Sequence, residues 1–243
     1  DNSGGKLYVV KDLLLYRKGE AMIIQNNIMK QIFKNVYFIN GTAYAGKSTM
    51  VKLLAERHNG NCCGENYHDI LMDAIDKENQ PNLSYIHTMK DWQEFINRTP
   101  EEYDNWIIGC GEEATSLEIV RLIQLVEQGK KIFVDTNISV EILKEISDYN
   151  HVAIMLSPQS MSVNRFFERD DEEKQFILAQ INNAQDPEKT MANYRECLAR
   201  INSHEKHIAY ENSGFFTMVR TEDRTIPDAL EMLEKHFGLN QDK

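Results

Sequence analysis

The stretch Val36-Tyr-Phe-Ile-Asn-Gly-Thr-Ala-Tyr-Ala-Gly-Lys-Ser-Thr-Met-Val-Lys-Leu-Leu54, written VYFINGTAYAGKSTMVKLL, joins three local patterns. Residues 36–40 are a short β-branched and aromatic run, which is typical of a buried strand. From Met50 to Ala55 the apolar residues recur at helical spacing, and Gly60 is a suitable stop for that helix. A loop with two glycines lies between the two patterns. The stretch therefore predicts a strand, a loop and a helix in direct succession.

The loop has the spacing of a phosphate-binding loop of the Walker A type, Gly41-x4-Gly46-Lys47-Ser48. Glycines let the backbone N–H groups turn around an anion, and the following helix directs the positive end of its dipole to the same phosphates. We expect Lys47 to reach the β and γ phosphates of ATP and Ser48 to hold Mg²⁺, with Thr49 a weaker candidate. The predicted nucleotide-binding residues are Gly41, Thr42, Ala43, Tyr44, Ala45, Gly46, Lys47, Ser48 and Thr49.

Strands and helices continue to alternate along the chain. Short apolar strands are predicted at residues 131–135 and 151–156, with a helix at 139–148 between them. A strand at 215–219 and a helix at 226–237 form the last pair. Such alternation predicts an α/β fold of three layers, with about five parallel strands and right-handed crossovers, in a single domain over residues 1–243.

The remaining segments read mainly as helices. In the N-terminal extension, residues 1–35, one helical face would carry Ala21, Ile24, Ile28 and Ile32. The polar insertion 61–129 contains two helix signals, a capping box that begins at Thr99 and a second helix from Glu112 to Glu127. Another helix is predicted from Asp186 to Ile201.

Composition excludes several classes of function. A formal net charge of -11 and a pI near 5.2 argue against a nucleic-acid surface. No apolar run approaches the ~18 residues of a membrane-spanning helix, and no signal peptide is recognisable. The four cysteines lack the spacing of a zinc site or a disulfide framework. We therefore expect a soluble cytoplasmic protein with neither membrane nor nucleic acid as partner.

The loop by itself does not separate kinases from GTPases and mechanical ATPases. The chain has no Asn-Lys-x-Asp guanine signature, and Asp135, at the end of a predicted strand, is followed by Thr136 instead of the glutamate found in many ATPases. Both absences favour phosphoryl transfer to a small acceptor.

With these residues the chain resembles the small-molecule P-loop kinases, such as adenylate, cytidylate, gluconate and shikimate kinases, over residues 36–238. The resemblance implies that Asp135 supports magnesium, although an aspartate here could instead cap a helix. Val163-x-Arg165-x3-Arg169 is similar to the lid helix of these kinases, within a lid at residues 164–190. Four residues apart, the two arginines would share one helical face and clamp the phosphates, unless the neighbouring acidic residues pair with them. Arg195, with Arg200 behind it, would return to the phosphates.

The insertion is the acceptor side in this family. Glu65 would orient or deprotonate the acceptor hydroxyl, with Asp69 as the alternative and His68 a further candidate base. Trp92, Phe95 and Trp106 either cover the acceptor or belong to the core, and aromatic residues at this spacing are more often core. The Gly-Phe-Pro-Arg stretch of adenylate kinases is absent after Asp135, which argues against a nucleoside monophosphate acceptor.

The sequence thus predicts an ATP- and magnesium-dependent phosphotransferase, with Lys47, Arg165, Arg169 and Glu65 as catalytic residues. Two other functions stay open. One is a nucleotide-binding regulatory module that senses ATP, and the other is a P-loop ATPase that drives a partner.

Overall fold

The computed structural model describes residues 13–17, 20–168 and 172–239. Its main feature is a five-stranded, all-parallel sheet in the order β4-β5-β3-β6-β7, which confirms the predicted mixed α/β fold with about five parallel strands. The strands are β3 (Val36–Gly41), β4 (Asn61–Cys63), β5 (Ile132–Asp135), β6 (Val152–Leu156) and β7 (Phe216–Val219). Because all five strands run in one direction, their carboxyl ends meet at one edge of the sheet.

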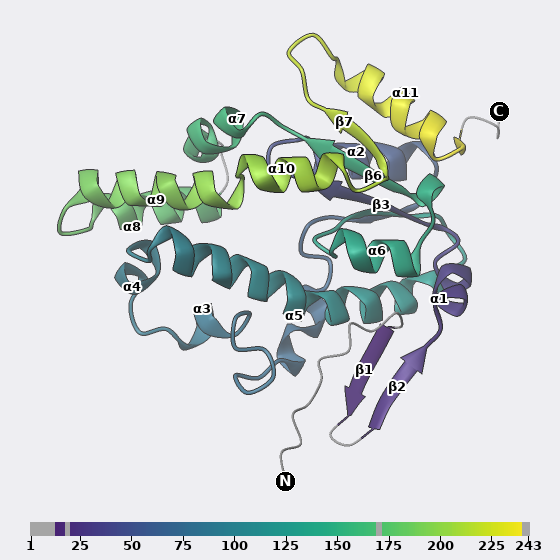
Figure 1. Ribbon diagram of the computed structural model, residues 1–243, viewed down its shortest axis with the longest axis horizontal. Coiled ribbons are helices and arrows are strands. Elements are labelled where there is room, and N and C mark those ends of the chain that lie inside the picture. Colours follow the sequence, from purple (N-terminus) through teal and green to yellow (C-terminus); the bar gives the residue numbers. More distant parts are fainter. Residues whose placement is uncertain (1–12, 18–19, 169–171, 240–243) are drawn as a thin grey trace.

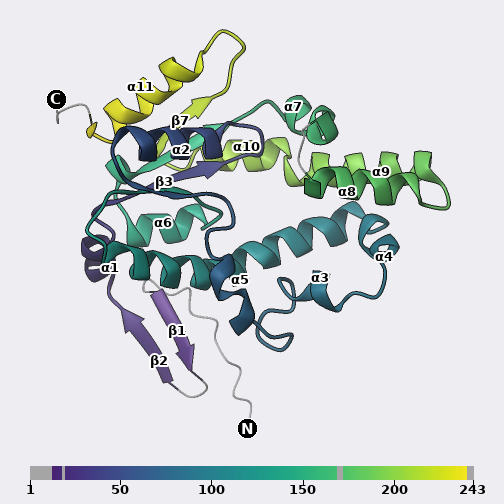
Figure 2. The same ribbon diagram turned by 180° about the vertical axis from the view of Figure 1, so that it is seen from behind.

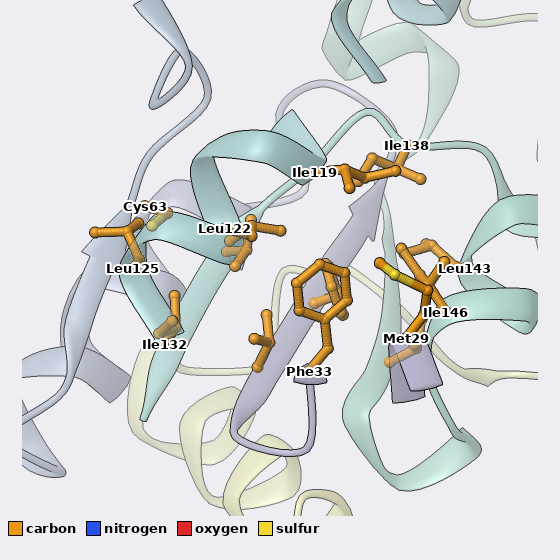
Figure 3. Close-up of a cluster of buried hydrophobic side chains, with 14 of the residues drawn as sticks. Met29, Phe33, Cys63, Ile119, Leu122, Leu125, Ile132, Ile138, Leu143 and Ile146 are labelled. Carbon is orange, nitrogen blue, oxygen red and sulfur yellow. The ribbon is translucent and has the colours of Figure 1, made fainter. Parts of the chain in front are cut away.

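Helices cover both faces of the sheet (Figure 1). One face packs on α2 (Lys47–Arg57) and α11 (Ile226–His236). The other packs on α1 (Asn26–Ile32), α5 (Pro100–Val126) and α6 (Val140–Ile146), and Figure 3 shows the apolar cluster on that side. Successive side chains of a β-strand point to opposite faces of the sheet. Phe38 therefore faces the α1, α5 and α6 side, and its neighbour Ile39 faces the α2 and α11 side. Because these strands are buried on both faces, their sequences are continuous apolar runs.

A helical extension projects beyond the sheet (Figure 2). It has an apolar cluster of its own, in which Phe95, Tyr103 and Tyr194 are buried. Trp92 and Trp106 pack against this cluster, so these aromatic side chains serve as core. The extension contains the first half of α5 together with α3 (Tyr85–Thr88), α4 (Trp92–Ile96), α8 (Glu172–Asn182) and α9 (Pro187–Ile201). The remaining helices are α7 (Gln159–Asn164), α10 (His204–Glu211) and 3-10 turns at Asp69–Ala74, Tyr149–His151 and Phe166–Glu168.

Helix α5 corrects the prediction of two separate helices in the insertion. The predicted capping box is present, with Thr99 as N-cap and Glu102 as its partner, but the helix then runs without a break for 27 residues. Gly109 lies within this helix and faces the side chain of Asn82: an added Cβ would lie 2.3 Å from Asn82 Nδ2. This glycine serves close packing, which its sequence neighbours do not reveal.

The N-terminal extension also differs from the prediction. Residues 26–32 form the expected helix, but β1 (Leu13–Arg17) and β2 (Glu20–Ile24) pair as an antiparallel two-stranded sheet. Pairing between two segments stabilises the strands, and helical spacing within one segment gives no sign of it. The short strand β4, at the start of the predicted insertion, was missed for the same reason. Among the described residues, none of the helices has the length and hydropathy of a membrane-spanning segment.

Candidate functional site

The glycine loop begins where β3 passes closest to β6. Gly41 is paired with Met155 and has a φ of 132°, and a Cβ atom at this position would lie 1.9 Å from the Met155 carbonyl oxygen. The next residue, Thr42, donates its N–H to the same carbonyl at 3.0 Å. Only glycine allows the two backbones to approach in this way.

The loop then turns through two residues with positive φ, Tyr44 at 65° and Gly46 at 92°. Gly46 is the N-cap of α2 and has no side chain to occupy the first-turn N–H groups, which an α-helix leaves without backbone partners. The amino end of an 11-residue helix therefore opens into the loop. This is the backbone geometry that binds a phosphate group.

Serines from the β6 side support the loop from behind. The Ser157 N–H donates to Thr42 Oγ1 at 2.8 Å, and its hydroxyl donates to the Ala43 carbonyl at 2.6 Å. Ser162 Oγ donates to the same carbonyl at 3.1 Å. We did not predict these two serines, although Ser157 directly follows a predicted strand, which is a usual position for site residues in parallel sheets.

The side chains of Lys47, Ser48 and Asp135 lie close together beside the glycine loop. Asp135 is 2% exposed at the end of β5, and its Oδ2 atom accepts a hydrogen bond from Ser48 Oγ at 2.7 Å. Lys47 Nζ lies 3.7 Å from Asp135 Oδ1 and donates to the Thr42 carbonyl at 3.2 Å. The alternative reading of Asp135 as a helix cap is wrong, because Ser139 is the N-cap of α6.

This donor set suits magnesium. A hydroxyl and a carboxylate side by side are hard oxygen ligands, and Mg²⁺ typically takes only one or two protein groups, with water and phosphate completing its shell. A closed cage is not needed for such binding. In the part of the chain that the structure describes, no group of three or more His, Cys, Asp or Glu residues forms one.

A buried carboxyl group lies next to this constellation. Glu118 of α5 is 0% exposed, and its Oε2 atom accepts hydrogen bonds from Thr136 Oγ1 at 2.6 Å and from Tyr67 OH at 2.9 Å. Burial raises the pKa of Glu118 to about 7, although the hydrogen bonds from Thr136 and Tyr67 act to lower it. Sequence reasoning missed Glu118, because a single glutamate in a long helix resembles a solvated surface residue.

Replacement of Glu118 by Gln is expected to flatten the dependence of stability on pH. The folded-state pKa of about 7 lies above the ordinary value of 4.5, so the folded chain keeps a proton that the unfolded chain releases in this window. The contribution of Glu118 to the free energy of unfolding therefore falls as pH rises from 4.5 through 7, by up to about 3 kcal/mol. Urea unfolding between pH 4.5 and 8 measures this loss, which Glu118→Gln should lack. Parallel curves for wild type and variant would contradict it. The exposed Glu112→Gln, on the same helix, is the matched control.

The predicted lid helix requires a correction. Helix α7 ends at Asn164, Arg165 is its C-cap, and a 3-10 turn follows. Arg165 is therefore not followed by the helical turn that would align it with Arg169, which itself lies outside the described residues. Here the adjacent Phe166 and Phe167 both pack against Tyr194 of α9, a contact with a distant segment that the local spacing of the two arginines does not reveal.

Arg165 still lies beside the loop through its main chain. Tyr44 OH donates to the Arg165 carbonyl at 2.7 Å, so the loop contacts the start of the predicted lid. The Arg165 side chain is 55% exposed, and its Nε atom lies 3.9 Å from a carboxylate oxygen of Glu168.

The other predicted site residues lie in different parts of the fold. Glu65 is exposed in the turn after β4, at the same sheet edge as Asp135, because β4 runs parallel to β5. Asp69 is exposed at the start of a 3-10 turn. His68 is buried, and burial lowers its pKa. Arg195 is exposed on α9 in the helical extension. The structure thus brings the Glu65 turn towards the loop and leaves the role of Arg195 as a prediction.

A cavity of about 140 Å³ adjoins the loop on its α11 side. Met50, Met155 and Met218 contribute apolar surface, and Arg220 and Arg224 line the cavity as well. Arg220 Nη1 also donates to the Tyr44 carbonyl at 2.6 Å, so the cavity and the loop share a contact. No periodic pattern in the sequence indicates this cavity, because its lining comes from four separate segments of the chain.

Comparisons with known proteins assign no family to this chain. No protein-family model matches it, and no curated protein matches it. Among solved structures, a dephospho-CoA kinase from Campylobacter jejuni is similar with a TM-score of 0.32 and 17% sequence identity, over 83% of this chain and 94% of that chain. A TM-score of this size describes a loose resemblance and carries no functional argument. The predicted membership in the P-loop kinases stays a prediction, and the function proposed next depends on the loop and its surroundings.

Proposed function

We propose that the chain is an ATP- and magnesium-dependent phosphotransferase that moves the γ-phosphoryl group to a small-molecule hydroxyl or phosphate. One observation carries the proposal: Lys47, Ser48 and Asp135 meet at the open amino end of α2, beside a loop with three positive-φ residues. A cation, a hydroxyl and a carboxylate at a helix N-terminus are what a magnesium triphosphate requires.

Each group has a definite task in this proposal. The loop N–H groups from Ala43 to Thr49 would hold the β and γ phosphates, because the Thr42 N–H is donated to the Met155 carbonyl. Lys47 leaves its contact with Asp135 and neutralises charge on the transferring phosphoryl group. Ser48 and Asp135 would hold magnesium, which would neutralise negative charge on the phosphates.

The cavity beside the loop is the proposed site of the nucleobase. It adjoins Gly46 and Thr49, so a base seated there would leave its triphosphate over the amino end of α2. Its methionine surface suits the face of an aromatic base, and Arg220 and Arg224 can stack on it or donate hydrogen bonds to its edge. The site supports a nucleoside triphosphate as the phosphoryl donor.

The acceptor side of the proposal is the turn after β4. Glu65 would orient or deprotonate the acceptor, and Arg165, Arg169 and Arg195 would reach the phosphates as the lid closes and excludes water. The exposure of Glu65, Arg165 and Arg195 supports their availability to substrates. The proposed enzyme is cytoplasmic and acts on small molecules, with neither nucleic acid nor membrane as partner.

Measurement of ADP release with a panel of metabolites tests the proposal. Stimulation by one compound supports the phosphotransferase. Tight nucleotide binding without acceptor-dependent turnover would identify a regulatory module, and turnover independent of any acceptor would identify an ATPase that drives a partner.

A variant that fills the cavity tests the base site separately. Ala229→Trp, on α11 at the cavity wall, is expected to weaken ATP binding by about 10-fold or more, because the base loses its apolar contacts. Binding of inorganic triphosphate should remain near the wild-type value. Calorimetric titration of both ligands measures the difference. The exposed Ala192→Trp on α9 is the control, and equal loss of both ligands in Ala229→Trp would argue against a base site here.

A further inference from the structure

A buried carboxylate oxygen joins two segments of the proposed site. Oε2 of Glu118 accepts hydrogen bonds from Tyr67 OH at 2.9 Å and from Thr136 Oγ1 at 2.6 Å. Tyr67 lies in the turn that carries Glu65, and Thr136 directly follows Asp135. The acceptor turn and the strand end at the magnesium position are therefore held by the same atom, which comes from α5.

The hydrogen bonds continue to the first glycine of the loop. The Ile138 N–H donates to Thr136 Oγ1 at 3.1 Å, and the Ile138 carbonyl accepts a hydrogen bond from Asn40 Nδ2 at 2.6 Å. Asn40 Oδ1 accepts the N–H of Gly41 at 2.5 Å. Together these residues form the Glu118 network: Asn40, Tyr67, Glu118, Thr136 and Ile138.

Packing alone does not explain a carboxyl group at this position. Glu118 is fully buried, and its second oxygen, Oε1, has no hydrogen-bond partner among the described residues. Burial of such a group is unfavourable, and an apolar side chain of similar size would fill the space at lower cost. What the carboxyl group contributes is the fixed orientation of two hydroxyl groups on different segments.

We propose that Glu118 is a positioning residue, which sets the Asp135 carboxylate and the Tyr67 turn relative to the glycine loop. The inference rests on the proposed function, because it assigns Asp135 to magnesium and the turn to the acceptor. Partners that orient a metal ligand from the second layer typically change metal affinity by about 10- to 100-fold. Glu118 acts one residue away from Asp135, through Thr136.

The test compares Glu118→Met with Glu118→Gln. Equilibrium titration of ATP with and without Mg²⁺ gives the gain in affinity that magnesium provides. In Glu118→Met this gain should fall by about 10-fold, while magnesium-free ATP binding stays near the wild-type value. Glu118→Gln should restore most of the gain, because its amide oxygen can accept the same two hydrogen bonds. A role in packing alone would not separate these two variants.

Thr136→Val removes the hydroxyl group that donates to Glu118. It is the test variant if Glu118→Met does not fold. It should reduce the magnesium gain by a similar factor, and the double variant should lose no more than either single one, because both act through one contact. A folded Glu118→Met or Thr136→Val with the full magnesium gain overturns the positioning role. Absence of ATP binding in the wild type would instead overturn the proposed function, so the two failures are distinguishable.

Discussion

Gly41→Ala is expected to destabilise the fold by more than about 4 kcal/mol, which few single substitutions do. A Cβ atom at this position would lie 1.9 Å from the Met155 carbonyl oxygen, 2.7 Å from its carbonyl carbon and 2.9 Å from its nitrogen. All three are backbone atoms of β6, so no side-chain rotation relieves the clash. A φ of 132° is in addition unfavourable for alanine. To relieve the clash, β3 would have to move away from β6 at the centre of the sheet.

Urea unfolding followed by circular dichroism measures the loss. Gly111→Ala is the matched control, because it lies within α5 and a Cβ atom there meets no other atom within 4 Å. That control should gain up to about 1 kcal/mol, since alanine favours the helix over glycine. A Gly41→Ala protein as stable as the wild type would show that β3 and β6 do not approach each other as described.

Lys47→Ala is expected to weaken binding of magnesium ATP by about 100-fold or more. The loss of a charged donor to the phosphates is worth roughly 3 kcal/mol, and each 1.4 kcal/mol is a factor of ten in affinity. Stability should change little, because Lys47 makes one backbone contact at 3.2 Å and a long ion pair at 3.7 Å with Asp135. Isothermal titration with ATP, alongside thermal unfolding, separates the two effects.

The control for Lys47→Ala is Lys52→Ala, an exposed lysine farther along the same helix. It removes the same charge from α2 at a position away from the loop, and should leave affinity near the wild-type value. A folded Lys47→Ala protein that binds ATP with unchanged affinity would contradict the assignment of the loop, and with it the proposed function.

The sequence was sufficient for the strand, loop and helix around Gly41, for the parallel sheet and for most of its helices. In these cases the information is local. Period-two and period-3.6 patterns, a capping box and the spacing of two glycines are read within a few residues. The spatial proximity of Asp135 to Ser48 also followed, because carboxyl ends of parallel strands share one edge.

Tertiary structure decided the features that depend on partners distant in the chain. Arg165 was expected on a helix with Arg169, but α7 ends at Asn164 and the following segment packs Phe166 and Phe167 against Tyr194 of α9. The β1–β2 pair and the unbroken α5 also depend on contacts between segments, which local spacing does not encode.

Glu118 shows the difference most clearly. In the sequence it is one of 38 acidic residues, and nothing in its neighbours separates it from a solvated one. Its burial and raised pKa arise only when α5, the Tyr67 turn and the end of β5 come together. Local sequence specifies which backbone conformations are favourable, whereas the environment of a side chain is set by segments that only folding brings into contact.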